Sequence, residues 1–370
     1  MTTVSGDIKT TPMMHQYLSI KEQYRDYILF YRMGDFYEMF FEDAITAARD
    51  LEITLTSRNK NEEKPVPMCG VPVKAATGYI GRLIDKGHKV AVCEQLEDPS
   101  RTRGLVRRDV VRVVTPGMVV DNLLLDAASH NFVVAVSRNG NRTGIASLDV
   151  TTGTFRVAES HRDSVIVEEI MRIDPAELIF PESIADGDGL FAPDGRLAGK
   201  SVSRLPDRVF DYSDARKRLL ALFRTRSLEG FGCETMHAGI GAAGALAYYV
   251  QETQKQEIRH LSGLETYFFE KFMHIDDVGC RNLELLKNLS NGGRKGTLID
   301  IMDATLTAMG GRLLKNWLRY PLLDPAAIEQ RLDAIEALKS QNAVREEIRS
   351  LLKQMADIER LGGKAALGHA

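Results

Sequence analysis

The residues best suited to form a site are an aromatic and a carboxylate two positions apart, Phe36 and Glu38. They follow a glycine, where an apolar run of strand length, Ile28 to Met33, has just ended. In this position both side chains could project from the end of a sheet. A structural explanation stays open beside it: Asp35 and Glu38 could form the capping box of a helix. Phe36 and Phe40 could then be core residues on one helix face.

A second candidate is a group of basic side chains. Four arginines fall within eight residues, namely Arg101, Arg103, Arg107 and Arg108. The formal net charge of the chain is −3, so the composition does not predict a protein that coats nucleic acid through bulk charge. Any contact with nucleic acid must therefore be local. A solvated face is the default interpretation of such a run, and contact with phosphates is the alternative.

The sequence lacks the residue patterns of a structural zinc site, a disulfide framework and a nucleotide-binding loop. The cysteines at 69, 93, 233 and 280 show no CxxC spacing, which argues against a structural zinc site or a disulfide framework and indicates a reducing cytoplasm. No G-x-x-x-x-G-K-[ST] sequence occurs, and Gly292–Thr297 resembles one only superficially because its spacing differs. The sequence therefore predicts neither a metal site nor a nucleotide-binding loop.

Length and composition are typical of a globular protein. The 370 residues suggest two or three domains, and a hydrophobic content of 44% with 27% charged residues is ordinary for such a chain. No apolar run approaches the ~20 residues that a membrane span needs. Residues 1–11 lack the apolar centre of a secretory signal.

Helix and strand patterns alternate in the first part of the chain, which predicts a mixed α/β domain. We expect helices from Pro12 towards Tyr24, at Phe36–Leu51 and at Ala75–Lys86, and strands at Ile28–Met33, Ile53–Thr56, Lys89–Gln95 and Asp109–Val114. Gly87 is a suitable residue to end the helix before it.

The pattern then changes to a second α/β domain that begins with a β-meander. We expect strands at Phe132–Ser137, Thr143–Asp149, Thr154–Ala158 and Glu177–Phe180, and helices at Ser164–Ile173, Ser213–Ser227 and Met236–Lys255. The last helix is so rich in glycine and alanine that it must pack very close to a neighbouring element. A two-metal nuclease needs clustered carboxylates, and here Asp149 stands alone.

After about Leu264 the sequence turns helical. We expect helices at Arg281–Leu289, Thr297–Leu318, Pro325–Leu338 and Asn342–Leu361. Trp317 is predicted to be a core residue. The amphipathic pattern stops at Gly362–Ala370, which suggests a truncated chain whose bundle exposes apolar faces.

Five motifs, in order along the whole chain, resemble the MutS family of DNA mismatch recognition proteins, of bacterial type. They are Tyr31–Phe40, Pro67–Pro72 followed by Ala75, Val92–Pro99, Arg112–Gly117, and Asp303–Leu314 followed by Trp317–Leu318 and Pro321–Leu322. Two features depart from the family pattern. Lys74 stands where a histidine is usual, and the tail from Gly362 replaces an arginine-containing helix.

The resemblance implies three domains: a mixed α/β mismatch-binding domain at 1–115, a ribonuclease H-like α/β connector at 125–260, and the beginning of an all-α core/lever domain at 264–370. It also implies that the chain is an N-terminal half. ATP and Mg²⁺ would belong to a C-terminal P-loop domain, so we expect no cofactor and no enzyme activity in this chain.

For Phe36 and Glu38 the resemblance implies recognition of mispaired and unpaired bases from the minor groove. The Phe36 ring would wedge in and stack at the mispair, where unstacking costs less than in matched duplex. Glu38 would hydrogen-bond the mispaired base as a protonated donor, since phosphates repel its carboxylate. On matched duplex that repulsion would remain and would favour the mismatch.

The resemblance also implies partners and a location. Candidate contacts to the DNA backbone are Arg58, Lys74, Arg101, Arg103, Arg107 and Arg108. The partners would be double-stranded DNA with mismatches or small loops, a second MutS copy in the full-length protein, and a MutL-type repair partner at the connector, with no membrane. The location would be the bacterial cytoplasm, associated with the nucleoid when on DNA.

Overall fold

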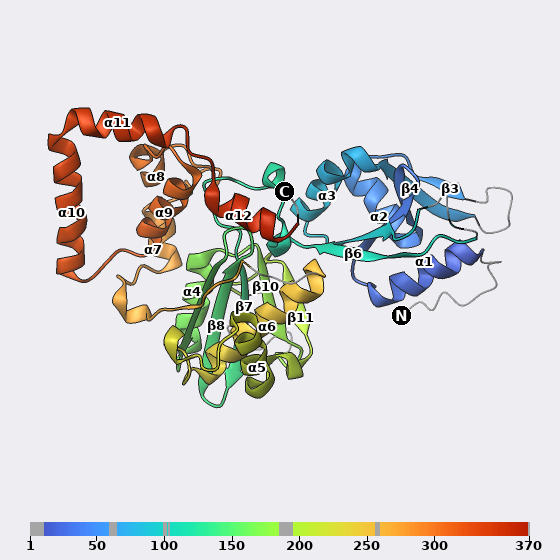
Figure 1. The fold of residues 1–370 in the computed structure, drawn as a ribbon, viewed down its shortest axis with the longest axis horizontal. Helices are drawn as coiled ribbons and strands as arrows, with labels where there is room; N and C mark the ends of the chain where they lie inside the picture. The colour runs from blue at the N-terminus through green and yellow to red at the C-terminus, as the bar shows by residue number, and fades with distance from the viewer. Residues whose placement is uncertain are drawn as a thin grey trace. The chain divides into compact units, whose positions relative to one another are not determined.

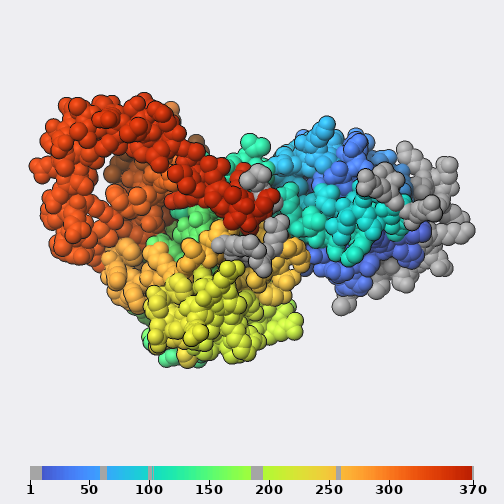
Figure 2. Space-filling model, in the orientation of Figure 1, coloured from blue at the N-terminus to red at the C-terminus, as the bar shows by residue number. Residues whose placement is uncertain are grey.

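A computed structural model describes residues 11–58, 65–98, 102, 104–184, 195–255 and 260–368. The chain divides into two compact units. One is Met1–Leu124 with Glu252–Lys255, and the other is Leu125–Gln251 with Gln256–Ala370. Colour identifies the segments of each unit in the ribbon and in the space-filling view (Figure 1, Figure 2). The predicted fold class, two mixed α/β parts followed by helices, is confirmed. The predicted domain bounds stay predictions.

The first unit contains a six-stranded sheet with the order β3-β4-β2-β1-β5-β6. Its strands are β1 Ile28–Met33, β2 Phe36–Phe40, β3 Thr56–Arg58, β4 Val66–Pro72, β5 Val90–Gln95 and β6 Arg108–Val114. The pair β1 and β5 is parallel, and the other neighbours in this order are antiparallel. The sheet is therefore built around a β1–β2 hairpin, with β5 on its other side.

Helices cover both faces of this sheet (Figure 1). On one face α1 Pro12–Gln23 buries Tyr17 against Tyr31 and Phe40. On the other face lie α2 Phe41–Leu51 and α3 Ala76–Asp85, the latter preceded by the 3-10 turn η1 Val73–Ala75. As predicted, α1 begins at Pro12, and Gly87 follows α3 with a positive φ of 84°.

The stretch Phe36–Phe40 is a strand, so the predicted helix Phe36–Leu51 is wrong in its first turn and begins at Phe41. The capping-box explanation for Asp35 and Glu38 is therefore wrong too. A two-residue turn with Gly34 at φ +60° folds the chain back, and Met33 then pairs with Phe36. Aromatic residues suit the half-buried, pleated surface that results. Phe40 has the predicted core role and is fully buried.

Smaller differences concern the neighbouring strand. The alternating residues Ile53–Thr56 were expected to form it, but the strand is β3 Thr56–Arg58. The apolar residues before it connect the end of α2 to the sheet edge, because Glu52 takes a left-handed conformation (φ +56°) that closes the helix. The predicted strands at 89–95 and 109–114 are confirmed within one residue.

The second unit contains another six-stranded sheet, with the order β11-β10-β7-β8-β9-β12. The meander is confirmed as β7 Val133–Asn139, β8 Arg142–Asp149 and β9 Thr154–Ser160, all antiparallel. On the far side of β7, β10 Glu177–Pro181 runs parallel to it. Two short strands were not predicted, β11 Val202–Leu205 and β12 Glu265–Thr266.

Helices again cover both faces of the sheet. On one face α4 Asp163–Ile173 closes an apolar core, and the other carries α5 Tyr212–Phe223 and α6 His237–Gln254. The predicted close packing of the last helix is confirmed at Gly144, where an added Cβ would lie 2.1 Å from the carbonyl carbon of Ala238 in α6. Other 3-10 turns of the described residues are Pro116–Met118, Asn122–Leu124, Asp207–Phe210, Glu229–Phe231 and Phe269–Lys271.

The C-terminal part of this unit is helical, but its helices are shorter than predicted. They are α7 Asp277–Asn282, α8 Leu298–Met302, α9 Ala308–Arg319, α10 Pro325–Ser340, α11 Asn342–Leu352 and α12 Ile358–Ala366. The helix expected at Arg281–Leu289 is wrong. Residue Thr307 breaks the next expected helix because its side chain caps Gly310 and starts α9.

Trp317 was predicted to be core but is 38% exposed, and the guanidinium of Arg331 covers its ring at 3.9 Å. Ile335 of α10, at the predicted helical spacing, is also exposed. In the space-filling view α10 and α11 border an open hollow (Figure 2). Apolar residues of this helical part are therefore exposed to solvent, as expected.

Candidate functional site

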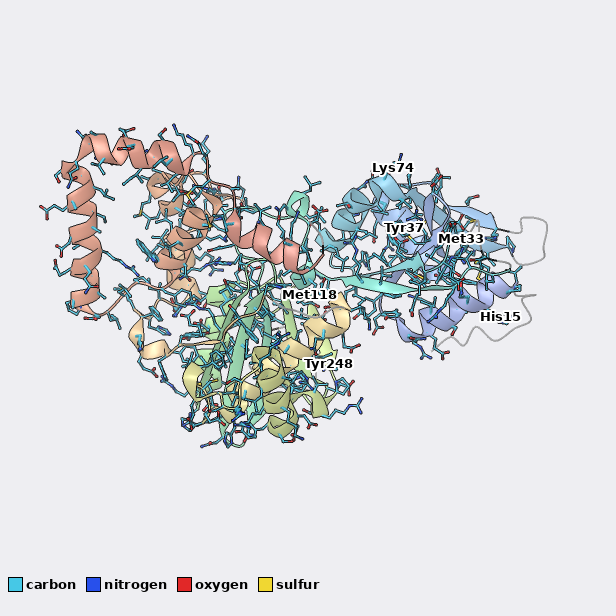
Figure 3. All side chains as sticks on the ribbon, in the orientation of Figure 1. His15, Met33, Tyr37, Lys74, Met118 and Tyr248 are labelled. Carbon is cyan, nitrogen blue, oxygen red and sulfur yellow. The ribbon has the colours of Figure 1, made fainter. Side chains whose placement is uncertain are left out.

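The predicted pair Phe36 and Glu38 lies on one face of the β1–β2 hairpin. In a strand, residues two apart point to the same side, so the spacing that suggested a site places both side chains together. The Phe36 ring is 47% exposed, while Tyr37 between them is buried on the opposite face. Figure 3 labels Met33 and Tyr37 on this hairpin, on either side of its turn. The pair thus stands next to the hairpin tip.

Glu38 is half-buried and unusual in its contacts. Its Oε2 lies 3.5 Å from Nη1 of Arg58 on β3, close enough for an ion pair. That oxygen nevertheless accepts no hydrogen bond from the described residues. Burial raises the pKa of the Glu38 carboxyl, against the opposing effects of Arg58 and Arg108. The neutral acid is therefore easier to form here than on an open surface, and it can donate a hydrogen bond.

Gly70 leaves space beneath the side chains of Phe36 and Glu38. The sequence did not indicate this role, although Gly70 lies in the motif Pro67–Pro72. It is paired with Glu38 across β2 and β4. A Cβ added to Gly70 would meet the carbonyl oxygen of Tyr37 at 3.3 Å, Cγ of Glu38 at 3.7 Å and Cδ1 of Phe36 at 3.9 Å. The missing side chain therefore leaves the pair lying directly over β4.

The predicted backbone-contact residues differ in exposure. Lys74 in η1 and Arg107 before β6 are exposed, and Arg58 is half-buried on the same face as Glu38. Arg108 is only 8% exposed. Its guanidinium donates to main-chain carbonyls, that of Arg32 at 2.8 Å and that of Val106 at 3.0 Å. Arg101 and Arg103 lie outside the described residues.

At the end of β8, the acid that a nuclease site would need is held by hydrogen bonds. Asp149 is fully buried, with Oδ2 2.8 Å from Nδ1 of His130 and Oδ1 accepting from the amide of Thr151 at 2.9 Å. Within the described ranges, no group of three acidic, histidine or cysteine side chains could hold a metal. Over the same ranges, no helix combines the length and apolar character needed to cross a membrane.

Comparisons with known proteins match this architecture along the chain. Protein-family models match MutS domain I at residues 11–122, MutS domain II at 131–262 and MutS domain III at 279–370. The two α/β parts and the helices thus define a modular protein with the MutS order of domains. The chain belongs to the MutS family.

Relatives match over nearly all of this chain. A DNA mismatch repair protein MutS from Desulfosudis oleivorans is 58% identical over 359 residues, which are 97% of this chain and 41% of that protein. Proteins with the same name from Desulfatibacillum aliphaticivorans and Symbiobacterium thermophilum are 51% and 45% identical, each over 98% of this chain and over 41% and 42% of their own lengths. The chain therefore spans about two fifths of the length of these relatives.

Proposed function

We propose that this chain recognises mispaired and unpaired bases in duplex DNA, the step that initiates mismatch repair. The observation that carries the proposal is the exposed ring of Phe36 beside the half-buried acid of Glu38 on a short hairpin. The names of the relatives, which are DNA mismatch repair proteins, support the same function.

Phe36 acts as the wedge. Inserting an apolar ring between base steps kinks the duplex and costs a few kcal/mol of unstacking. A mispaired base is already poorly stacked, so the same insertion costs less there, and one ring can serve many mispairs. Stacking on the exposed ring returns about 1–3 kcal/mol. Because Phe36 is adjacent to the turn, its ring can reach a groove ahead of the rest of the sheet.

Glu38 supplies the discrimination. Its carboxylate is repelled by phosphates, but its protonated form can donate to an acceptor on a displaced base. Two observations support this role: the buried Oε2 accepts no hydrogen bond from the described residues, and burial raises the pKa of the carboxyl. Both make the charged form less favourable than it is on an open surface. On matched duplex no displaced acceptor is offered, and the repulsion persists.

Contacts to the DNA backbone would come from Arg58, which lies beside Glu38, and from the exposed side chains of Lys74 and Arg107 in the same unit. Arg108 has an internal role instead, since its guanidinium is taken up by main-chain carbonyls. The connector part at residues 125–260 would dock a MutL-type repair partner. A second MutS copy would join in the full-length protein, and the location would be the cytoplasm.

The chain itself would be a binding protein without catalysis. Its three matched parts are domains I to III, and its sequence lacks a P-loop. We expect the purified chain neither to bind nor to hydrolyse ATP. Nucleotide turnover that co-purifies with the chain through successive columns would contradict this.

The test is a pair of binding curves, by fluorescence anisotropy, on a matched duplex and on the same duplex with one G·T mispair. Replacing Phe36 by alanine should erase the preference for the mispair, while Ile45→Ala, on the other side of the sheet and 41% exposed, should keep it. Repeating both at a second salt concentration separates backbone attraction from stacking.

Each outcome is informative. If Phe36→Ala retains the preference, the wedge model is wrong. If the unmodified chain binds both duplexes equally, these domains are an interaction module that does not read mispairs by themselves, and the proposed function fails for this chain.

A further inference from the structure

The motif that begins at Val92 starts in β5, and its residues do not belong to the Phe36 and Glu38 pair. Its acid Glu94 lies on the face of the sheet opposite to Phe36 and Glu38. The strand register shows this. Tyr31 of β1 pairs with Cys93 of β5, so the next residues, Arg32 and Glu94, lie side by side, and Arg32 in turn pairs with Tyr37 of β2. Arg32, Tyr37 and Glu94 are therefore neighbours on the back of the recognition hairpin.

These three side chains form a connected group. The Tyr37 hydroxyl donates to Oε1 of Glu94, and Nη1 of Arg32 lies 3.3 Å from Oε2 of the same carboxylate. The Arg32 guanidinium also covers the Tyr37 ring, with Cζ 5.6 Å from the ring centroid. Burial, followed by Glu94, raises the pKa of the Tyr37 hydroxyl to about 12, so it remains a donor at neutral pH.

The group reaches the turn itself. Nε of Arg32 donates to the carbonyl oxygen of Gly34, and the next carbonyl, that of Asp35, accepts from the amide of Val73 at 3.0 Å. Two consecutive main-chain oxygens of the turn are thus held, one from each side of the hairpin. Phe36 is the residue that follows directly. The two residues before it are therefore held through their carbonyl oxygens, and neither bond uses the Phe36 side chain.

We propose that Arg32, Tyr37 and Glu94 are positioning residues for mispair recognition, forming a brace that keeps the hairpin tip rigid while Phe36 is inserted. The inference rests on the proposed function of Phe36. A base stack that must open pushes back on the ring, and a tip that yields would let the ring retreat instead of unstacking the bases. To discriminate between mispaired and matched bases, the Phe36 ring must be held in position before it meets the DNA, and the residues bonded around the hairpin tip hold it there.

The test uses Glu94→Ala and Tyr37→Phe, with Glu22→Ala as the control. Glu22 also pairs with an arginine, at 2.8 Å, but in an exposed position on α1. The measured quantity is the ratio of the dissociation constants for matched and G·T duplex. Both brace variants should lower this ratio about three- to tenfold, towards the lower end of the effects found for residues coupled by direct contact. Matched-duplex affinity should stay unchanged, and Glu94→Gln, which still accepts from Tyr37, should restore part of the ratio.

A second measurement does not depend on DNA. Hydrogen exchange followed by mass spectrometry should show faster exchange for the peptide that contains residues 33–36 in both brace variants, and unchanged exchange there in the control. An unchanged ratio and unchanged exchange would overturn the proposal. So would an equal loss of affinity for both duplexes, because that indicates general damage to the fold.

The two hypotheses fail in different ways. If Phe36→Ala keeps the preference for the mispair, the proposed function fails first and the brace has nothing to position. If Phe36→Ala erases the preference but the brace variants retain the parent ratio, only the brace is wrong.

Discussion

The Oε2 atom of Glu38 lies 3.5 Å from Nη1 of Arg58, and yet no described group donates a hydrogen bond to it. A carboxylate this buried would ordinarily be bonded. The guanidinium offsets part of the charge without satisfying the oxygen, and burial raises the pKa of this carboxyl. A donor or acceptor brought in by a ligand would complete the site.

The first prediction concerns pH. If Glu38 takes up a proton when a mispair binds, affinity for the G·T duplex should rise as pH falls from about 8 towards 6, by at most tenfold per pH unit. In Glu38→Gln this dependence should vanish, because the amide does not titrate. The variant should also bind matched duplex more tightly, since the repulsion is gone. A parent chain whose affinity is flat over this range would contradict proton uptake.

The same substitution has a consequence for stability. The pKa of Glu38 is raised by burial in the folded chain, so its contribution to stability is fully present below the unfolded pKa and is lost as pH rises through the folded one. At neutral pH the charged group is therefore a cost. Thermal unfolding of the free chain should show Glu38→Gln to be at least as stable as the parent at neutral pH, with the advantage fading in acid.

The second prediction concerns salt. Lys74→Ala and Arg107→Ala should each weaken matched and mismatched duplex alike, and should each reduce the slope of log K against log salt by about 0.9 if one phosphate contact is lost. Arg49→Ala on α2, on the other face, is the control. An unchanged slope would assign the residue to a solvated face, the alternative interpretation of these cations.

The third prediction compares adjacent glycines in α12. A Cβ added to Gly363 would lie 2.2 Å from the carbonyl oxygen of Thr151, whereas one added to Gly362 meets nothing within 4 Å. Gly363→Ala should therefore destabilise the chain by about 1–3 kcal/mol through overpacking. Gly362→Ala should stabilise it by up to about 1 kcal/mol, because alanine is the better helix former. Chemical denaturation measures both, and equal effects would contradict the close approach of α12 to Thr151.

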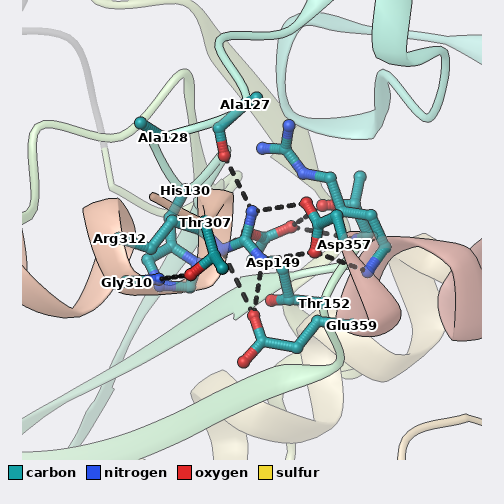
Figure 4. A network of polar contacts seen from close by, with 12 residues as sticks. Ala127, Ala128, His130, Asp149, Thr152, Thr307, Gly310, Arg312, Asp357 and Glu359 are labelled. Atoms are coloured by element: carbon teal, nitrogen blue, oxygen red, sulfur yellow. Dashed lines mark hydrogen bonds and ion pairs between the residues drawn. The ribbon is translucent and has the colours of Figure 1, made fainter. Parts of the chain in front are cut away.

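The fourth prediction concerns a buried ion network that joins α9, α12 and the segment before β7 (Figure 4). The guanidinium of Arg312 is 2.7 Å from both Asp357 and Glu359 and donates to the carbonyl oxygen of Ala127 at 2.8 Å. Arg312→Met should cost about 1–3 kcal/mol, because the hydrogen bonds to both carboxylates and to the carbonyl oxygen of Ala127 are lost. Lys217→Ala, which breaks the exposed pair with Asp214, should cost under about 1 kcal/mol.

Sequence patterns predicted well those features that repeat along the chain. The meander of β7 to β9 followed from alternation and turn residues, and the close packing of α6 followed from its small residues. Phe36 and Glu38 share a face because the element is a strand, whereas the helix that was expected would have pointed residues two apart in different directions. A spacing of two residues is typical of one face of a strand, but the spacing of four between the aromatic residues 36 and 40 also fits a helix. The local pattern therefore fits both elements.

Features that depend on distant partners were not predictable in this way. Arg108 belongs to a basic run, but the carbonyl of Arg32 that binds its guanidinium is 76 positions away. Trp317 has the character of a core residue, yet α10 leaves it partly exposed. Likewise, nothing local indicates that Glu94 meets Tyr37, because only the order β2-β1-β5 in the sheet brings them together.

The segment at residues 126–129 is held through the side chains of Asp126 and Ser129, which bind Lys315, and also through its main chain. Arg312 binds the carbonyl oxygen of Ala127, and Arg360 binds those of Asp126 at 3.1 Å and Ser129 at 2.6 Å. Every amino acid carries that oxygen, so the identity of residue 127 can drift during evolution without loss of the anchor. Its length cannot, since one inserted or deleted residue would move all three oxygens out of register. Homologues should therefore vary in the amino acid at position 127 and be constant in the length of this segment.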